Sequence, residues 1–131
     1  MQNDKLNFEY IIAGTGPDVE KIVKLAEELG VAERIKLLGW VEPDEIKEIF
    51  HIFDIMIHPS PVDEPYSVAV IEAMAVGLVV VASEVTFAVL DRIKHGINGY
   101  IYKAGDVEEL ADRIIWCFEN KNGLLEIGEV V

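Results

Sequence analysis

The chain has 131 residues, 51% of them apolar, which is enough to bury the core of one compact domain and too few for two. Its 24 acidic and 11 basic side chains give a formal net charge of −13. Such a surface repels nucleic-acid phosphates and anionic lipids, so we expect no nucleic-acid partner and no direct membrane contact. We expect residues 1–120 to form the domain and residues 121–131 to be a tail.

The cysteine content and the N-terminal sequence indicate the compartment. Cys117 is the only cysteine and stands in an apolar helical pattern, so we expect a small core residue rather than a reactive thiol. The first residues lack the basic start and apolar run of a signal peptide, and no apolar run approaches the roughly 18 residues of a membrane helix. We therefore expect a soluble, cytoplasmic protein.

In the first half of the chain, short apolar runs alternate with amphipathic stretches. Residues 8–13 are β-branched and aromatic and predict a strand, which the glycine-rich turn 14–17 ends. Apolar residues then recur at helical spacing over 19–29, up to Gly30. Residues 35–38 predict a second strand, and 43–50 a helix that starts with proline and two acidic residues.

The same alternation continues through the middle of the chain. Residues 54–58 predict a strand and 65–76 a helix, with Gly77 placed to end it. Residues 78–82 are apolar without alternation, as in a parallel strand that is covered on both faces. A short helix is predicted over 87–94.

The last elements are a strand over 99–102 and a helix that ends near residue 118. Asp106 is a good N-cap for this helix, with Glu109 three residues later as in a capping box. Five strands, each followed by a helix through short connections, predict an α/β fold. We expect a Rossmann-like, doubly wound, mainly parallel sheet of about five strands with helices on both faces. The loops that follow the strands would share the ligand-binding edge of the sheet.

Two carboxylates stand out near this edge. Glu64 and Glu72 have seven residues between them, and Pro65 is well placed to start the helix that carries Glu72. Both can then border one cleft at a helix N-terminus, where carboxylates accept hydrogen bonds from sugar hydroxyls and free N–H groups bind a phosphate. The alternative is that two acids at this spacing are merely a solvated helix face.

Other loop residues permit both structural and functional interpretations. Gly14 and Gly16 follow a strand, but the third glycine of a dinucleotide-binding turn is missing, which argues against a dehydrogenase. Trp40 can stack on a base or cover the sheet edge, and we expect it to cover the edge. His58 and Ser60 are expected to anchor a loop rather than act in catalysis. No cluster of side chains has metal-ligand spacing, so we expect no intrinsic metal site.

Eight segments occur together in an order that resembles a known family: Gly14-Thr-Gly-Pro17, Ile35-Lys-Leu-Leu-Gly39, Ile55-Met-Ile-His-Pro-Ser60, Glu64-Pro-Tyr-Ser67, Ile71-Glu-Ala-Met-Ala75, Val80-Val-Ala-Ser83, His95-Gly-Ile-Asn-Gly99 and Gly105-Asp-Val-Glu-Glu-Leu110. They resemble the C-terminal, donor-binding domain of retaining glycosyltransferases of the two-domain GT-B fold, which carry a Glu-x7-Glu motif. The resemblance implies a nucleotide-diphosphate sugar as the donor substrate and no cofactor.

The resemblance also implies a role for each site residue. Glu64 would contact hydroxyls of the transferred sugar as the catalytic candidate, and the amides of Tyr66 and Ser67 would approach the sugar or the diphosphate. Glu72 would hold the ribose hydroxyls. Gly14 and Gly16 would lie at the edge of the nucleotide site, and the loop that contains Val41 would contact the base through its backbone.

The chain departs from the family pattern in three places. Tyr66 and Ser67 replace a usual Phe-Gly pair, Val79 replaces a proline, and Phe87-Ala88 replaces a Gly-Gly pair. The Arg and Lys that face the diphosphate in the family would precede this segment, and so would the acceptor-binding N-terminal domain. We therefore expect a fragment that is inactive alone and can self-associate through exposed apolar surface. The alternative is a binding or regulatory module of the same fold.

Overall fold

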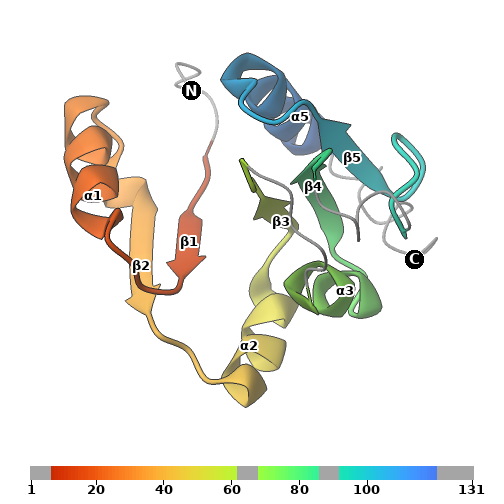
Figure 1. The fold of residues 1–131 in the computed structure, drawn as a ribbon, viewed down its shortest axis with the longest axis horizontal. Coiled ribbons are helices and arrows are strands. Elements are labelled where there is room, and N and C mark those ends of the chain that lie inside the picture. Colours follow the sequence, from red (N-terminus) through yellow and green to blue (C-terminus); the bar gives the residue numbers. More distant parts are fainter. Residues whose placement is uncertain (1–6, 62–67, 86–91, 121–131) are drawn as a thin grey trace. The chain divides into compact units, whose positions relative to one another are not determined.

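The computed structural model describes residues 7–61, 68–85 and 92–120. These residues belong to two compact units, one within residues 2–46 and the other within residues 47–131 (Figure 1). Helix α2, Pro43–Ile49, spans the boundary between them.

The first unit is built on two parallel strands, β1 at Tyr10–Ala13 and β2 at Ile35–Gly39. Helix α1, Val19–Glu28, connects them and ends just before Gly30, which has a φ of +71°. This left-handed conformation suits glycine because it has no Cβ. The two strands end together, since the Gly14 N–H donates to the Gly39 carbonyl over 2.7 Å. The first βα unit therefore follows the predicted pattern.

Two short 3-10 helices were not predicted by the hydrophobic pattern. One, η1, lies at Ala32–Arg34 immediately before β2, and the other, η2, at Phe50–Ile52 immediately after α2. Each is only three residues long, which is too short for a periodicity to show. Phe50 is buried and its ring packs edge-to-face on that of Phe53, three residues later.

The second unit contains three parallel strands in the order β3-β4-β5: Ile55–His58, Val79–Ser83 and Gly99–Tyr102 (Figure 1). Helix α3, Val68–Ala75, connects β3 to β4, and helix α5, Val107–Glu119, follows β5. Every strand pair in the described residues is parallel, as predicted. The described strands pair as a set of two and a set of three, rather than in one continuous ladder.

Strand β4 lies at the centre of the second core. All five of its residues are buried, which confirms the prediction from its unbroken apolar run. Val79 and Val81 pack with Tyr100, Tyr102 and Cys117 of α5 on one face. Val80 and Ala82 alternate with them and are equally buried, while α3 packs against β3 and β4.

Two further helices were predicted around β4. The predicted helix over 65–76 is present as α3, and residues 65–67 lie outside the described residues. Of the predicted helix over 87–94, residues 87–91 also lie outside them, and Arg92 is helical. Ile93 and Lys94 are not helical, so the predicted end of this helix was wrong. None of the helices in the described ranges has the length and apolarity needed to cross a bilayer.

Candidate functional site

The carboxyl ends of β3 and β4 are joined by a side-chain hydrogen bond. Ser83, the last residue of β4, donates its hydroxyl to the Ser60 carbonyl over 2.7 Å. His58 ends β3 opposite Ala82. A further backbone bond, from the Glu84 N–H to the Tyr102 carbonyl at 3.0 Å, fixes the adjacent end of β5. This edge is where parallel sheets bind ligands.

Glu72 lies in α3, the helix that packs against β3 and β4. The helix buries Val70, Ala73 and Met74 toward β3 and β4, and this anchors the backbone that carries Glu72. Glu72 itself is half-buried. Among the described residues, its carboxylate makes no hydrogen bond or ion pair. A half-buried carboxylate on an anchored helix can accept hydrogen bonds from a ligand.

In the first unit, the predicted nucleotide-site residues follow β1 and β2. Gly14 has a φ of +138°, and a Cβ at Gly14 or Gly16 would meet no atom within 4 Å, so both face open space. Val41 is 7% exposed, which leaves only its backbone as a candidate contact. Trp40 is 71% exposed and its indole N–H donates to the Glu42 carboxylate over 3.0 Å, so it does not cover the sheet edge.

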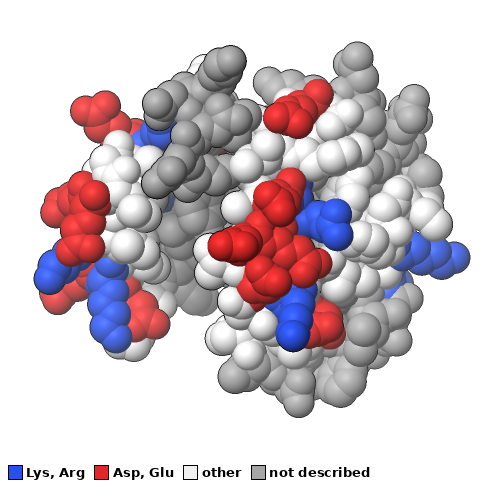
Figure 2. All heavy atoms as spheres, turned by 90° about the horizontal axis from the view of Figure 1, so that it is seen from above, with Lys and Arg blue, Asp and Glu red and all other residues white. Residues whose placement is uncertain are grey.

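Glu64, Tyr66 and Ser67 lie outside the described residues, and so does Phe87. Their predicted roles therefore remain predictions. In the ranges that the structure does describe, no three His, Cys, Asp or Glu side chains come together as a metal-binding group. On the face shown in Figure 2, acidic side chains gather in groups, and basic side chains lie beside these groups.

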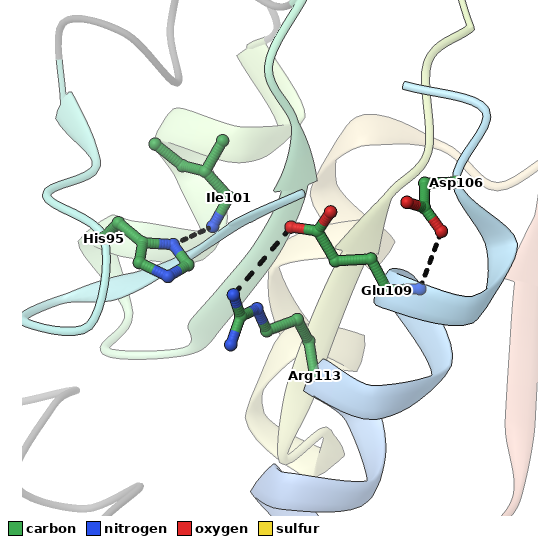
Figure 3. A network of polar contacts seen from close by, with 5 residues as sticks. All are labelled: His95, Ile101, Asp106, Glu109 and Arg113. Carbon is green, nitrogen blue, oxygen red and sulfur yellow. Dashed lines mark hydrogen bonds and ion pairs between the residues drawn. The ribbon is translucent and has the colours of Figure 1, made fainter. Parts of the chain in front are cut away.

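A polar network lies around β5 and the start of α5 (Figure 3). Asp106 accepts a hydrogen bond from the Glu109 N–H at 2.9 Å, which confirms the predicted N-cap. The Glu109 side chain does not complete the capping box, because it lies 3.8 Å from the Arg113 guanidinium instead. At the other end of β5, the His95 Nδ1 accepts from the Ile101 N–H at 2.9 Å. These contacts stabilise β5 and the start of α5.

Asn98 is a structural residue that the pattern of the sequence did not single out. It is nearly fully buried just before β5. Its carbonyl oxygen accepts from the Lys94 N–H at 2.7 Å, and its amide donates to the Arg92 carbonyl at 3.0 Å. In the sequence, Asn98 stood out only as part of the segment His95-Gly-Ile-Asn-Gly99 that resembles the family. One side chain thus closes the loop that enters β5.

Cys117 is fully buried in the core beside Tyr100, as predicted from its apolar surroundings. Burial raises the pKa of the Cys117 thiol to about 11. In the unfolded chain a thiol has a pKa of about 8.5. Between this pKa and that of the buried thiol, ionisation favours the unfolded state. Stability from the neutral thiol is therefore complete below about pH 8.5 and is lost as the pH rises toward 11.

We expect the free energy of unfolding to fall by about 2–3 kcal/mol more in the wild type than in Cys117→Ala when the pH rises from 8 to 11. Urea titrations at each pH measure it. The pKa values of Tyr10 and Tyr100 are also raised, mainly by burial. The comparison between variants removes the effect of Tyr10, whereas Cys117 itself helps to raise the pKa of Tyr100, which adds to the difference between the two proteins. Parallel pH profiles for the two proteins would contradict the prediction.

Comparison with known proteins identifies relatives along nearly the whole chain. The chain is 35% identical over 120 residues to the uncharacterized glycosyltransferase MJ1607 of Methanocaldococcus jannaschii, covering 88% of this chain and 30% of that protein. It is 39% identical over 110 residues to the amylovoran biosynthesis glycosyltransferase AmsK of Erwinia amylovora, covering 79% of this chain and 26% of that protein.

Solved structures show the same fold. Anabaena Alr3699/HepE in complex with UDP superposes with a TM-score of 0.84 at 28% identity, covering 92% of this chain and 34% of that one. The same protein has also been solved with UDP-glucose. The chain spans about a third of the length of these relatives. The Rossmann-like α/β fold is that of GT-B glycosyltransferases. Residues 1–129 match the model of the glycosyl transferases group 1, and the chain belongs to this family.

Proposed function

We propose that this chain is the donor-binding part of a glycosyltransferase that moves a sugar from a nucleotide-diphosphate sugar to an acceptor hydroxyl with retention. The observation that carries the proposal is the half-buried Glu72 carboxylate, which has no partner among the described residues and lies on a helix packed against β3 and β4. The UDP and UDP-glucose complexes of Anabaena Alr3699/HepE support the choice of ligand class. In this proposal residues 1–120 form the donor-binding domain.

Glu72 would accept hydrogen bonds from both ribose hydroxyls, because a carboxylate has two acceptor oxygens and no donor. The transferred sugar would be held by Glu64, with the amides of Tyr66 and Ser67 facing the sugar or the diphosphate. Gly14 and Gly16 would border the nucleotide, and the backbone of Val41 would contact the base. The open space next to both glycines permits a close approach of a ligand to their backbone.

The chemistry that we propose needs no separate protein base. The acceptor hydroxyl would attack the anomeric carbon on the face from which the diphosphate leaves, and the leaving phosphate oxygen would take the hydroxyl proton. Such a departure requires positive charge near the diphosphate, which we assign to parts of the longer protein. The acceptor would also bind there, so the isolated chain is expected to bind donors without transferring sugar.

The ribose role of Glu72 can be tested by calorimetric titration with UDP, UDP-glucose, UDP-N-acetylglucosamine and GDP-mannose. We expect Glu72→Gln to weaken binding of the preferred donor about 10- to 100-fold, since it removes a charge-assisted acceptor. Glu119→Gln makes the same chemical change on the exposed end of α5 and should bind like the wild type.

A ligand without ribose hydroxyls sharpens this test. The nucleoside diphosphate whose 2′ and 3′ hydroxyls are both replaced by hydrogen should bind wild type and Glu72→Gln equally, because the proposed contact no longer exists. If Glu72→Gln weakens that analogue as much as the natural nucleotide, the carboxylate acts elsewhere. No binding of any donor by the wild type would overturn the proposed function.

A further inference from the structure

Exposed apolar side chains line the edge at which the three strands of the second unit begin. The tails of the arrows mark this edge in Figure 1, and the register of both strand pairs places the three starts side by side. Ile52 precedes β3, Val76 precedes β4 and Ile97 precedes β5, with exposed fractions of 71%, 37% and 55%. Apolar side chains that are exposed together on one edge indicate an interaction surface.

The turn before β5 combines an exposed apolar side chain with positive charge. The Lys94 carbonyl accepts from the Ile97 N–H at 2.9 Å and from the Asn98 N–H at 3.2 Å, and the buried Asn98 side chain holds both ends of the turn. The side chains of Arg92 and Lys94 are exposed, and among the described residues neither makes an ion pair or a hydrogen bond. Residues 92–105 contain no carboxylate. The turn therefore presents Ile97 and two unpaired cations.

Trp116 of α5 lies beside this turn. Its ring packs on that of Tyr100 with centroids 5.2 Å apart, and the Tyr100 ring also contacts His95 of the turn at 5.6 Å. The Trp116 side chain is 40% exposed. Indole rings favour the interface between water and lipid, because they are both apolar and able to donate a hydrogen bond. We call the following residues the amino-edge surface: Ile52, Val76, Arg92, Lys94, Ile97 and Trp116.

The net charge of −13 predicts repulsion from anionic lipids, and the charge around the turn departs from that expectation. Exposed charges act over about 8 Å at physiological ionic strength. Glu48 and Asp54 lie on the β3 side, two strand spacings or roughly 10 Å from the turn. Glu119 lies one helical turn beyond Trp116, and the two cations of the turn outnumber it. The local charge is therefore positive.

We propose that the amino-edge surface docks on an anionic lipid bilayer. Ile97 and Trp116 enter the boundary between headgroups and acyl chains, while Arg92 and Lys94 meet the lipid phosphates. A stable protein partner would cover about 800 Å² and fill packed pockets. Here the exposed apolar side chains stand on separate loops before the strands, which suits a fluid surface. The proposed donor site lies at the opposite, carboxyl edge of the sheet, so the inference does not depend on the proposed function.

The test measures partition of the chain into vesicles by flotation. One set of vesicles is pure phosphatidylcholine, and the other is an equal mixture of phosphatidylcholine and phosphatidylglycerol. Lys94→Glu is compared with Lys103→Glu, which makes the same change at an exposed position past the other end of β5, roughly 13 Å along the strand. Ile97→Ser is compared with Val107→Ser, because Val107 is 75% exposed at the start of α5. Urea midpoints of all four variants should match the wild type, since each changes an exposed side chain.

We expect the wild type to partition at least about tenfold more strongly into the mixed vesicles than into phosphatidylcholine alone. Lys94→Glu should weaken binding to the mixed vesicles about tenfold, and Lys103→Glu should stay within about threefold of wild type. Ile97→Ser should weaken it about five- to tenfold, and Val107→Ser should bind like the wild type.

The inference is overturned if the wild type does not bind the mixed vesicles or binds pure phosphatidylcholine equally well. Equal losses in Lys94→Glu and Lys103→Glu would also overturn it, because net charge alone would then explain the binding. Wild-type binding by Ile97→Ser would show a purely electrostatic contact, which indicates a soluble acidic partner and contradicts lipid docking. UDP-glucose titrations of the same proteins keep the two proposals apart: failure to bind the donor overturns the proposed function and leaves this inference standing.

Discussion

Replacing Gly99 by alanine is expected to lower the free energy of unfolding by about 2–3 kcal/mol. A Cβ at this position would lie 2.8 Å from the backbone oxygen of Val80 and 3.0 Å from the Cγ2 of Ile93. The Ile93 side chain can shift, whereas the Val80 carbonyl is held by the parallel pairing of β4 with β5. The clash must therefore distort the ladder in which Val80 lies opposite Gly99.

Urea denaturation followed by far-ultraviolet circular dichroism measures this loss. Gly16→Ala is the steric control, because a Cβ there meets no atom within 4 Å and its φ is not in the left-handed region. Its free energy of unfolding should stay within about 0.5 kcal/mol of wild type. A Gly99→Ala protein as stable as Gly16→Ala would show that β4 and β5 can separate without cost.

The elements with a clear period or a local signal were predictable from the sequence. The unbroken apolar run of β4 indicated a strand covered on both faces, and its five residues are all buried. Asp106 was identified as an N-cap because its partner lies only three residues away. A hydrogen bond between residues so close in sequence depends little on the surrounding tertiary structure.

Contacts set by tertiary structure could not be predicted in the same way. The Glu109 side chain was expected to return to the Asp106 N–H, yet that N–H donates to the Lys103 carbonyl at 2.9 Å, and Glu109 pairs with Arg113 instead. The bond from Ser83 to Ser60 depends on the pairing of β3 with β4. Neither arrangement leaves a pattern in the residues themselves, because each is decided by which groups the fold brings together.

The site was predictable only in part, for a similar reason. The position of Glu72 on a helix followed from the apolar residues around it, and α3 confirms that placement. Its lack of a partner among the described residues depends on what packs nearby, which the sequence cannot specify. For Trp40 the sequence favoured covering of the sheet edge over stacking, and this prediction was wrong, because the side chain is exposed.

Replacing Asn98 by alanine is expected to lower the free energy of unfolding by about 2–4 kcal/mol. The substitution removes both hydrogen bonds of a nearly buried side chain, so the Lys94 N–H and the Arg92 carbonyl lose their partners. Each unsatisfied group carries its own desolvation cost. Asn120→Ala is the matched control, because its amide donates to the Trp116 carbonyl at an exposed position. That change should cost about 0.5 kcal/mol or less.

Asn98→Asp tests the two hydrogen bonds separately, because pH decides whether the new carboxyl can donate as well as accept. An ionised carboxylate can still accept a hydrogen bond from the Lys94 N–H. It has no hydrogen to donate to the Arg92 carbonyl, so a carboxylate oxygen would face the carbonyl oxygen and repel it. Protonation of the new carboxyl restores an O–H donor, so its neutral form is favoured in the folded state. The stability deficit relative to wild type should therefore be largest near neutral pH and shrink as the pH falls toward 4. Urea midpoints of both proteins between pH 4 and 7 measure this deficit. A deficit that does not change with pH would show that the amide donor is not what Asn98 contributes.

Gly99 follows Asn98 directly, so the substitutions at these two positions probe the same junction by different means. Those at Asn98 test its hydrogen bonds, and Gly99→Ala tests its steric fit against β4.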